Sequence, residues 1–233
     1  MKKILKFIDQ KIFNKFFSDK ISRNKFKYAS LTRYSIQNYF YWQNHFLHIS
    51  ENKIPGDIYE FGVGNGHSLS LILMNFLENK NKFIDNKKIY AFDSFAGFPE
   101  PSIEDHSNRN PKKKDWSHTS EIFVKNNLSI FGFSEKEINN ITFVKGYFED
   151  TLLKHPVNDF SLMHLDCDLY KSYEICLNQL NKINKNFKRI VCVDEYGINN
   201  TNFKGADKAI NNFLIKKGIS ILESRNSKNY FFY

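Results

Sequence analysis

The sequence has few residues of the kinds that cross-link a chain. It contains three cysteines in 233 residues, and their odd number and lack of C-x-x-C spacing exclude a disulfide framework and a cysteine-rich zinc site. Cys167, Cys176 and Cys192 sit in or beside apolar runs, where a reduced thiol serves as a small hydrophobic residue. Because reduced cysteines are typical of proteins inside the cell, we expect a cytoplasmic location.

Long hydrophobic runs are also missing. No apolar segment approaches about 18 residues, the length of a transmembrane helix, and charged residues interrupt the first apolar stretch, so we expect neither a membrane span nor a signal peptide. With 41% hydrophobic and 16% aromatic residues, the chain can nevertheless bury a full core. The length fits one α/β domain with a short extension.

The excess of positive charge is unevenly distributed. The formal net charge is +9, of which residues 1–27 carry +7 and the remaining 206 residues only +2. A nearly neutral body excludes a nucleic-acid-binding domain by bulk charge, so we expect no nucleic-acid partner. Residues 2–20 place apolar side chains at helical spacing between lysines, which predicts a basic amphipathic helix. Packing on its own domain, a homodimer face and a peripheral membrane contact are the uses open to it, and we expect a homodimer.

Short apolar runs alternate with helical stretches along most of the chain. The pattern predicts helices at 33–50, 68–78, 119–128, 172–183 and 206–217, and strands at 57–61, 88–92, 141–144, 160–165, 189–193, 219–222 and 230–233. This alternation predicts an α/β fold with a doubly wound, mostly parallel, Rossmann-like sheet of seven strands. Because the last two strands have no helix between them, we expect the last strand to be antiparallel. Residues 1–54 form an N-terminal helical extension and residues 55–233 the main domain in this prediction.

A glycine-rich turn follows the first predicted strand and leads into a helix. The spacing is G-x-G-x-G over residues 62–66, with Glu60 two residues earlier. Glycines let the backbone approach a ligand, and a helix N-terminus offers free N–H donors to a carboxylate or phosphate. We therefore take Glu60, Gly62, Val63 and Gly64 as candidate binding residues, with a tight turn of purely structural function as the alternative. Ser68 either caps the helix or reaches a bound carboxylate.

Two further segments follow predicted strands. Asp93 and Ser94 come at the end of the second strand, where an acidic side chain can accept hydrogen bonds from ribose hydroxyls. Gly146 and Tyr147 follow the third strand, and we expect them to lie against a flat ring of the ligand.

Four carboxylates follow the fourth and fifth predicted strands. Asp166 and Asp168 come after one strand, and Asp194 and Glu195 after the next. Because parallel strands end at the same edge of a sheet, these side chains should meet there and repel one another. A divalent cation with oxygen ligands would relieve the repulsion. Solvated turns and helix caps are the alternative.

The segment 97–118 is too long and polar for a plain connection. It contains three of the five prolines and a lysine triplet at 112–114. Loops of this length are often lids over a site. We interpret it as a substrate lid whose lysines would suit a substrate that carries phosphates.

Taken together, these segments resemble a class I S-adenosylmethionine-dependent methyltransferase, and more narrowly the macrocin O-methyltransferase family of sugar-methylating enzymes. The strings that carry the resemblance are GDIYEFGVGNGHS, IYAFDSFAGFP, GYFEDTL, HLDCDLYKS and VDEYG, in this order between Gly56 and the C-terminus. The resemblance implies that Glu60, Gly62 and Gly64 line the methionine end of the cofactor. It further implies that Ser68 meets the cofactor's carboxylate and that Asp93 holds its ribose.

The resemblance also implies a magnesium site made by Asp166, Asp194 and Glu195. Catechol-type relatives place a lysine base three residues after the first metal ligand, and this sequence has Leu169 there. The base must then be a carboxylate, with Asp166 as the first choice and Asp168 as the second.

The function implied is metal-dependent methylation of a sugar hydroxyl, on a nucleotide sugar or on a glycan destined for a capsule or other surface polysaccharide. One alternative is methylation of a small catechol-like or natural-product hydroxyl. Another is a non-catalytic cofactor-binding module that docks through residues 2–20.

Overall fold

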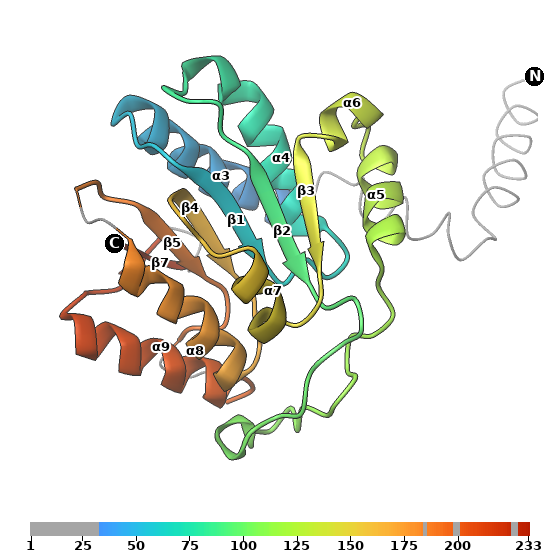
Figure 1. Cartoon of the computed structure of the whole chain (residues 1–233), viewed down its shortest axis with the longest axis vertical. Coiled ribbons are helices and arrows are strands. Elements are labelled where there is room, and N and C mark those ends of the chain that lie inside the picture. The colour runs from blue at the N-terminus through green and yellow to red at the C-terminus, as the bar shows by residue number, and fades with distance from the viewer. Residues whose placement is uncertain (1–32, 184–185, 198–200, 225–227) are drawn as a thin grey trace, which may run out of the picture.

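The structure is a computed structural model that describes residues 33–183, 186–197, 201–224 and 228–233 (Figure 1). The basic helix predicted at 2–20, with its dimer and membrane alternatives, lies outside the described residues. Within the described ranges, no helix combines the length and the apolar character that a membrane crossing requires.

A seven-stranded sheet forms the centre of the molecule, with strand order β3-β2-β1-β4-β5-β7-β6. Strands β1 to β5 are parallel, while β7 runs antiparallel to both β5 and β6. The predicted doubly wound, mostly parallel sheet with an antiparallel last strand is therefore confirmed. The strands are β1 Asp57–Phe61, β2 Ile89–Asp93, β3 Ile141–Lys145, β4 Phe160–Leu165, β5 Ile190–Val193, β6 Leu222–Glu223 and β7 Asn229–Phe232.

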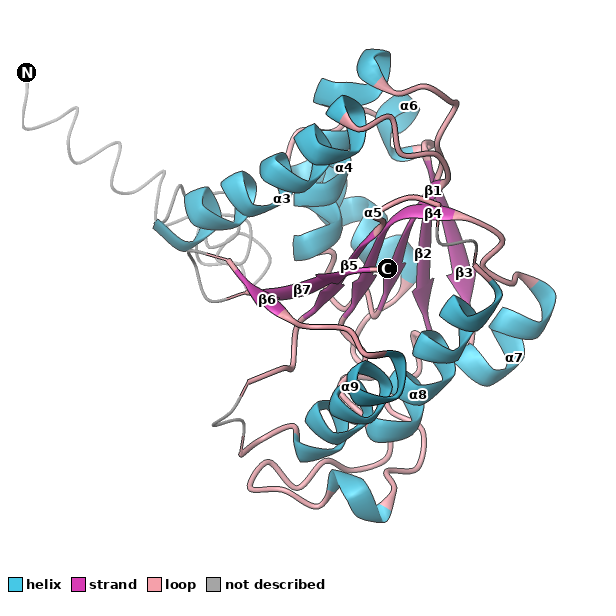
Figure 2. Ribbon diagram, turned by 90° about the vertical axis from the view of Figure 1, so that its left-hand side faces the viewer, coloured by secondary structure: helices cyan, strands magenta, loops and turns pink. Residues whose placement is uncertain are grey.

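Helices cover both faces of this sheet (Figure 2). One face carries α3 Arg33–Glu51, α4 His67–Asn79, α5 Glu121–Ile130 and α6 Glu135–Ile138, and the other carries α7 Phe148–Lys154, α8 Tyr170–Gln179 and α9 Lys204–Lys217. Three short 3-10 helices, η1 Lys80–Lys82, η2 Ile103–Asp105 and η3 Leu180–Lys182, complete the described elements.

Side chains alternate along each strand between two separate cores. Ile58 and Leu162 pack with the α3 and α4 side chains, whereas their neighbours Tyr59 and Met163 pack with α8 and α9. A strand buried on both faces needs an apolar residue at nearly every position, which is why these strands appear in the sequence as continuous apolar runs.

The structure differs from the sequence prediction in the short elements. The strand expected at 219–222 is only β6, at Leu222–Glu223, and the helix expected at 172–183 begins at Tyr170 and ends in a 3-10 turn. The short helices α6 and α7 are absent from the prediction. Elements of four to seven residues carry too few periodic positions for a helical pattern to stand out.

The order of the strands reverses between β1 and β4. In an open α/β sheet, a crevice forms at such a point beyond the carboxyl ends of the strands. The segments after β1, β2, β4 and β5 therefore meet at one edge, and all four carry the candidate site residues (Figure 1).

At the opposite end of the sheet, where the parallel strands begin, a buried lysine joins the segments that lead into β1 and β2. The Lys87 ammonium donates hydrogen bonds to the carbonyl oxygens of Ile54 and Gly56, both at 2.7 Å, and lies 2.9 Å from Asp85 Oδ1. Burial lowers the pKa of Lys87 against the opposing effect of Asp85. This contact ties the entry of β1 to the entry of β2, far from the candidate site.

Lys87→Met should destabilise the fold by about 2–4 kcal/mol, because it leaves two carbonyl oxygens without their donor and removes the ion pair with Asp85. Urea unfolding followed by circular dichroism measures this free energy. The neighbouring Lys88→Met is the control, since the Lys88 side chain is exposed. Equal stability of the two variants would contradict the structural role of Lys87.

Candidate functional site

A cavity of about 410 Å³ opens at the carboxyl edge of the sheet. Of the residues predicted from sequence, only Glu60 lies outside its lining. The predicted residues that line the cavity are Gly62, Val63, Gly64, Ser68, Asp93, Ser94, Gly146, Tyr147, Asp166, Asp168, Asp194 and Glu195. One space therefore contains the candidate residues that follow five of the strands.

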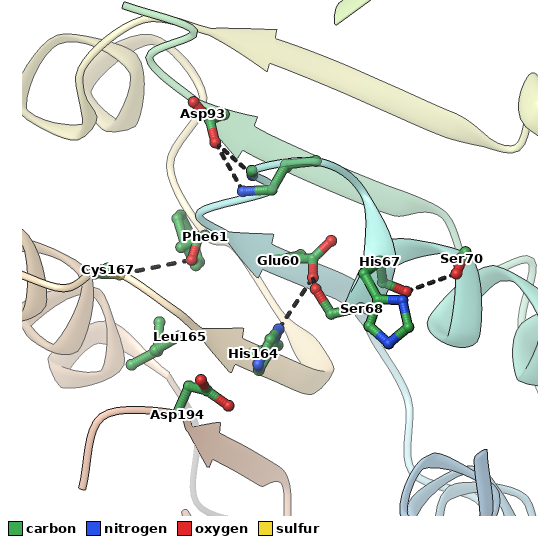
Figure 3. A network of polar contacts seen from close by, with 12 residues as sticks. Glu60, Phe61, His67, Ser68, Ser70, Asp93, His164, Leu165, Cys167 and Asp194 are labelled. Atoms are coloured by element: carbon green, nitrogen blue, oxygen red, sulfur yellow. Dashed lines mark hydrogen bonds and ion pairs between the residues drawn. The ribbon is translucent and has the colours of Figure 1, made fainter. Parts of the chain in front are cut away.

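The glycine turn is held by the carboxylate at the end of β2. Asp93 Oδ2 accepts hydrogen bonds from the backbone N–H groups of Val63 (2.8 Å) and Gly64 (3.0 Å), as Figure 3 shows. Asp93 Oδ1 accepts from Phe95 N–H at 2.7 Å. The carboxylate lines the cavity and also shapes the turn, so a ligand bound to it would be positioned relative to the turn.

Gly62 stands where the turn passes closest to the neighbouring strand. Its φ is +88°, and a Cβ atom there would lie 1.8 Å from the carbonyl oxygen of Asp166. The Asp166 N–H also donates to the Phe61 carbonyl oxygen at 2.9 Å. Only glycine fits this position, and the close approach sets the glycine turn directly beside the first carboxylate.

Beneath the cavity lies a buried polar network (Figure 3). Glu60 Oε1 accepts a hydrogen bond from Ser68 Oγ at 2.5 Å and lies 3.1 Å from His164 Nδ1. Its other oxygen is buried with no hydrogen-bond partner among the described residues. The helix α4 is capped by Gly66 without a side-chain hydrogen bond, so Ser68 is not a helix cap.

The same network governs the charge of His164. Burial lowers the pKa of this imidazole, but the hydrogen bond and negative charge of Glu60, with Asp166 and Asp194, outweigh burial and raise it. The surrounding carboxylates therefore favour the protonated form of His164 more than water would.

Three carboxylates gather at the ends of β4 and β5. Asp166, Asp194 and Glu195 offer ligand oxygens that all lie within 4.8 Å of one another. The buried Glu195 accepts a hydrogen bond from the Tyr173 hydroxyl, and Asp194 Oδ1 lies 2.9 Å from Lys228 Nζ. The sequence predicted these three side chains as a metal set, and the fold brings them together.

The electrostatics of this cluster fit a hard cation. Burial and the neighbouring Asp166 and Asp168 carboxylates raise the pKa of Glu195 well above its usual range, and burial with Asp194 raises the pKa of Asp166. Burial also favours the neutral form of Asp194, but the Lys228 ammonium outweighs it and lowers that pKa. Repulsion of this kind is relieved by a divalent ion, and all three donors are the oxygen atoms that Mg²⁺ prefers.

Asp168 stands apart from the three clustered carboxylates. Its backbone is left-handed, with φ at +59°, and burial and the Asp166 charge raise its pKa. Arg109 opposes this shift, with Nη1 at 3.8 Å from Asp168 Oδ1. Asp168 also lines the cavity.

The segment 97–118 forms one wall of the cavity. Phe98 N–H donates to the Asp115 carbonyl oxygen and Lys114 N–H donates to the Phe98 carbonyl oxygen, which closes the segment at its base. Near the middle of the segment, Asp105 Oδ1 accepts a hydrogen bond from the Tyr170 N–H at the start of α8 (2.7 Å). The expected lid is therefore held by hydrogen bonds both at its base and near its middle.

Sequence reasoning missed several residues of the site. Asn38 and Trp42 of α3 line the cavity, although the predicted domain boundary at residue 54 leaves them outside the main domain. Lys228 and Phe203 line it as well, and Arg109 contacts it through Asp168. None of these residues belongs to a local motif, so only the three-dimensional fold shows their position.

A family model for macrocin-O-methyltransferases matches residues 29–222 of this chain. Among curated proteins, the demethyldecarbamoylnovobiocin O-methyltransferase of Streptomyces niveus is 26% identical over 150 residues, which covers 62% of this chain and 54% of the relative. A tetracenomycin rhamnosyl 4'-O-methyltransferase of Streptomyces olivaceus is 28% identical over 131 residues, covering 54% of this chain and 48% of the relative. The chain spans about half the length of the curated relatives it matches.

Solved structures show the same fold. A crystal structure of a calicheamicin methyltransferase superposes with a TM-score of 0.69 at 21% identity, covering 87% of this chain and 81% of that one. An apo structure of that protein, described as a TDP-rhamnose 3'-O-methyltransferase, gives a TM-score of 0.58 at 20% identity, covering 87% of this chain and 82% of that one.

Gly62→Ala should destabilise the protein by at least about 2 kcal/mol more than Gly64→Ala, because its methyl group collides with backbone while the other meets open space. Both positions have positive φ, so the strain of a left-handed alanine, about 1–2 kcal/mol, is common to both variants. Thermal unfolding of the two variants measures the difference. Equal midpoints would show that the turn and the Asp166 backbone are not in contact.

Proposed function

We propose that this chain, which belongs to the macrocin O-methyltransferase family, transfers a methyl group from S-adenosylmethionine to a sugar hydroxyl. The observation that carries the proposal is the arrangement of one cavity, in which the glycine turn and Asp93 adjoin three carboxylates within 4.8 Å of one another. A methyltransferase needs a cofactor site and an acceptor site side by side, because transfer requires the two reacting atoms in line.

The cofactor half consists of the turn, the start of α4 and the ends of β2 and β3. The methionine end of the cofactor would lie along Gly62, Val63 and Gly64, next to the N–H donors at the start of α4. Asp93 would accept from the ribose hydroxyls, beside Ser94. Bound here, the cofactor supplies a methyl group on a positively charged sulfur.

Glu60 and Ser68 act below the cofactor site. Their hydrogen bond, at 2.5 Å, links β1 to the first turn of α4. The shared contact with His164 extends this link to β4. We assign Glu60 a positioning role: its hydrogen bonds hold the residues beneath the methionine end of the cofactor. Ser68 would face the cofactor's carboxylate.

Gly146 and Tyr147 would contact the adenine ring of the cofactor. Both line the cavity beyond the end of β3, and the Gly146 N–H donates to the Asp93 carbonyl oxygen at 3.0 Å. This hydrogen bond ties these residues to the strand end that would hold the ribose.

The acceptor half contains the carboxylate cluster. Asp166, Asp194 and Glu195 would hold Mg²⁺, with the Tyr173 hydroxyl orienting Glu195. The ion would supply positive charge that fixes two neighbouring hydroxyls of the acceptor and makes the reacting one more acidic.

A carboxylate must then accept the hydroxyl proton. The sequence favoured Asp166 as this base, but one of its oxygens belongs to the three-carboxylate cluster that would hold the ion. Asp168 lines the same cavity and stands outside the cluster. The geometry therefore favours Asp168 as the base and Asp166 as a metal-holding residue.

The names of similar proteins support a sugar as the acceptor. The names of two relatives specify methylation on a rhamnose unit. We propose a nucleotide sugar or a surface glycan as the substrate, with a role in polysaccharide synthesis. Methylation of a catechol-like hydroxyl is the runner-up, since the cluster would also hold a planar diol. We further propose a cytoplasmic location, supported by three buried free cysteines, and a homodimer.

S-Adenosylhomocysteine should bind in the micromolar range by isothermal calorimetry, and its affinity should be nearly independent of Mg²⁺. Uptake of a nucleotide sugar from a panel should require both S-adenosylhomocysteine and Mg²⁺, because the acceptor hydroxyls bind at the cluster. Addition of EDTA should abolish the heat of sugar binding and leave that of S-adenosylhomocysteine binding unchanged. Buffer prepared without calcium and magnesium should give the same result. Absence of cofactor binding would refute the proposed function.

Asp168→Asn should lower turnover by about 10²–10⁴-fold, the usual contribution of a general base. Asp166→Asn should also remove most turnover, but through loss of Mg²⁺ binding, which calorimetry measures separately. Both variants should keep the affinity for S-adenosylhomocysteine within about twofold. If Asp168→Asn turns over like wild type while Asp166→Asn does not, the base assignment reverts to Asp166.

A further inference from the structure

One guanidinium group touches three aromatic rings at the edge of the cavity. The Arg109 Cζ atom lies 4.9 Å from the ring centre of Phe98, 5.0 Å from that of Phe203 and 5.9 Å from that of Trp116. All three distances fall within the range of cation–π attraction, about 6 Å. Phe98, Trp116 and Phe203 line the cavity, whereas Arg109 lies behind them and outside the lining. We name these three residues the ring wall.

The ring wall comes from two distant parts of the chain. Phe98 and Trp116 stand at the two ends of the segment 97–118, and Phe203 directly precedes α9. Two hydrogen bonds hold these parts together next to Arg109. The Ser107 hydroxyl donates to the Asn202 carbonyl oxygen at 2.6 Å, and the Asn108 N–H donates to the Thr201 carbonyl oxygen at 3.2 Å.

Arg109 also fixes the distance from the ring wall to the candidate base. Its Nη1 atom is 3.8 Å from Asp168 Oδ1, so a single guanidinium separates the rings from that carboxylate. The ring wall, Asp168 and the carboxylate cluster line the same cavity.

The residue type fits this position. The chain has 29 lysines and only 5 arginines, yet an arginine occupies the site where a cation meets several rings. The guanidinium is planar and stacks on aromatic faces, whereas an ammonium is a compact, strongly hydrated point charge. A lysine here would keep the charge and lose most of the stacking.

We propose that Arg109 is a positioning residue that holds the ring wall beside Asp168, and that this wall stacks against the apolar face of the acceptor's sugar ring. The inference rests on the proposed function and adds the contacts that select the acceptor. A sugar ring has C–H groups on its faces and hydroxyls at its edge. The electron-rich faces of aromatic rings attract the C–H groups, while the hydroxyls would bind at the carboxylate cluster.

The first test needs no acceptor. The chain has two tryptophans, of which Trp116 is 51% exposed and Trp42 only 2%, so acrylamide quenching of fluorescence reports mainly on Trp116. Arg109→Met should increase the quenching about twofold, since the wall loses the group that holds it. Trp116→Phe identifies the Trp116 contribution. Quenching identical to wild type in Arg109→Met would overturn the positioning role.

The second test uses kinetics with TDP-rhamnose, UDP-galactose, methyl α-rhamnoside and catechol as acceptors. For the best sugar, Arg109→Met should raise KM about tenfold through the lost stacking. It should also lower kcat, because Asp168 loses the cation 3.8 Å from its Oδ1, whereas Arg109→Lys keeps a cation there and should change kcat less than threefold. Arg109→Lys should raise KM about threefold. Lys208→Met is the matched control, because Lys208 also faces a ring, Tyr170, and pairs with Glu104 of the same segment, away from the cavity.

The remaining outcomes separate the proposals. A parallel loss of affinity for S-adenosylhomocysteine and of thermal stability in both Arg109 variants would show a general structural role and overturn the inference. A wild-type protein that binds S-adenosylhomocysteine but methylates only catechol, or none of the sugars, would overturn the sugar wall alone. A wild type that does not bind S-adenosylhomocysteine would refute the proposed function instead. Should Arg109→Met fail to fold, Arg109→Lys and Arg109→Gln serve in its place.

Discussion

The site depends on the close approach of two backbone segments at the point where the strand order reverses. The chain leaves β1 through Gly62, which lies so near the Asp166 carbonyl oxygen that no side chain fits between them. This contact places the turn that would receive the cofactor against the residue that begins the carboxylate cluster. In the proposed transfer, a methyl group moves over a short distance, so a contact that fixes both halves of the site would also fix its geometry.

Electrostatic balance is the second constraint. Four carboxylates on two adjacent strand ends repel one another, and a cation lies on either side of them. Lys228 lies against Asp194, and Arg109 lies near Asp168, while Asp166 and Glu195 face each other. The uncompensated charge thus lies in the middle of the cluster, between the two cations. A divalent ion bound at that point would neutralise it without displacing either side chain.

The sequence allowed the prediction of elements and residues that are local along the chain. The parallel strands are buried on both faces and appear as apolar runs, and the turn at 62–66 adjoins its strand and its helix directly. The residues after those strands could therefore be assigned to one edge. That carboxylates gather at this edge could be predicted as well, because Asp166 and the pair Asp194 and Glu195 follow neighbouring strands.

Contacts between distant segments could not be predicted in this way. The placement of Trp42 in the cavity depends on how α3 packs across α4, and Arg109 meets Phe203 only because the segment 97–118 folds onto the start of α9. The two halves of the site thus differ in origin. The proposed cofactor half consists of strand ends and the turns attached to them, whereas the ring wall consists of loops joined by hydrogen bonds and by Arg109. Under the proposed function, a change in those loops would alter the acceptor contacts without disturbing the cofactor half, because the two halves come from separate segments.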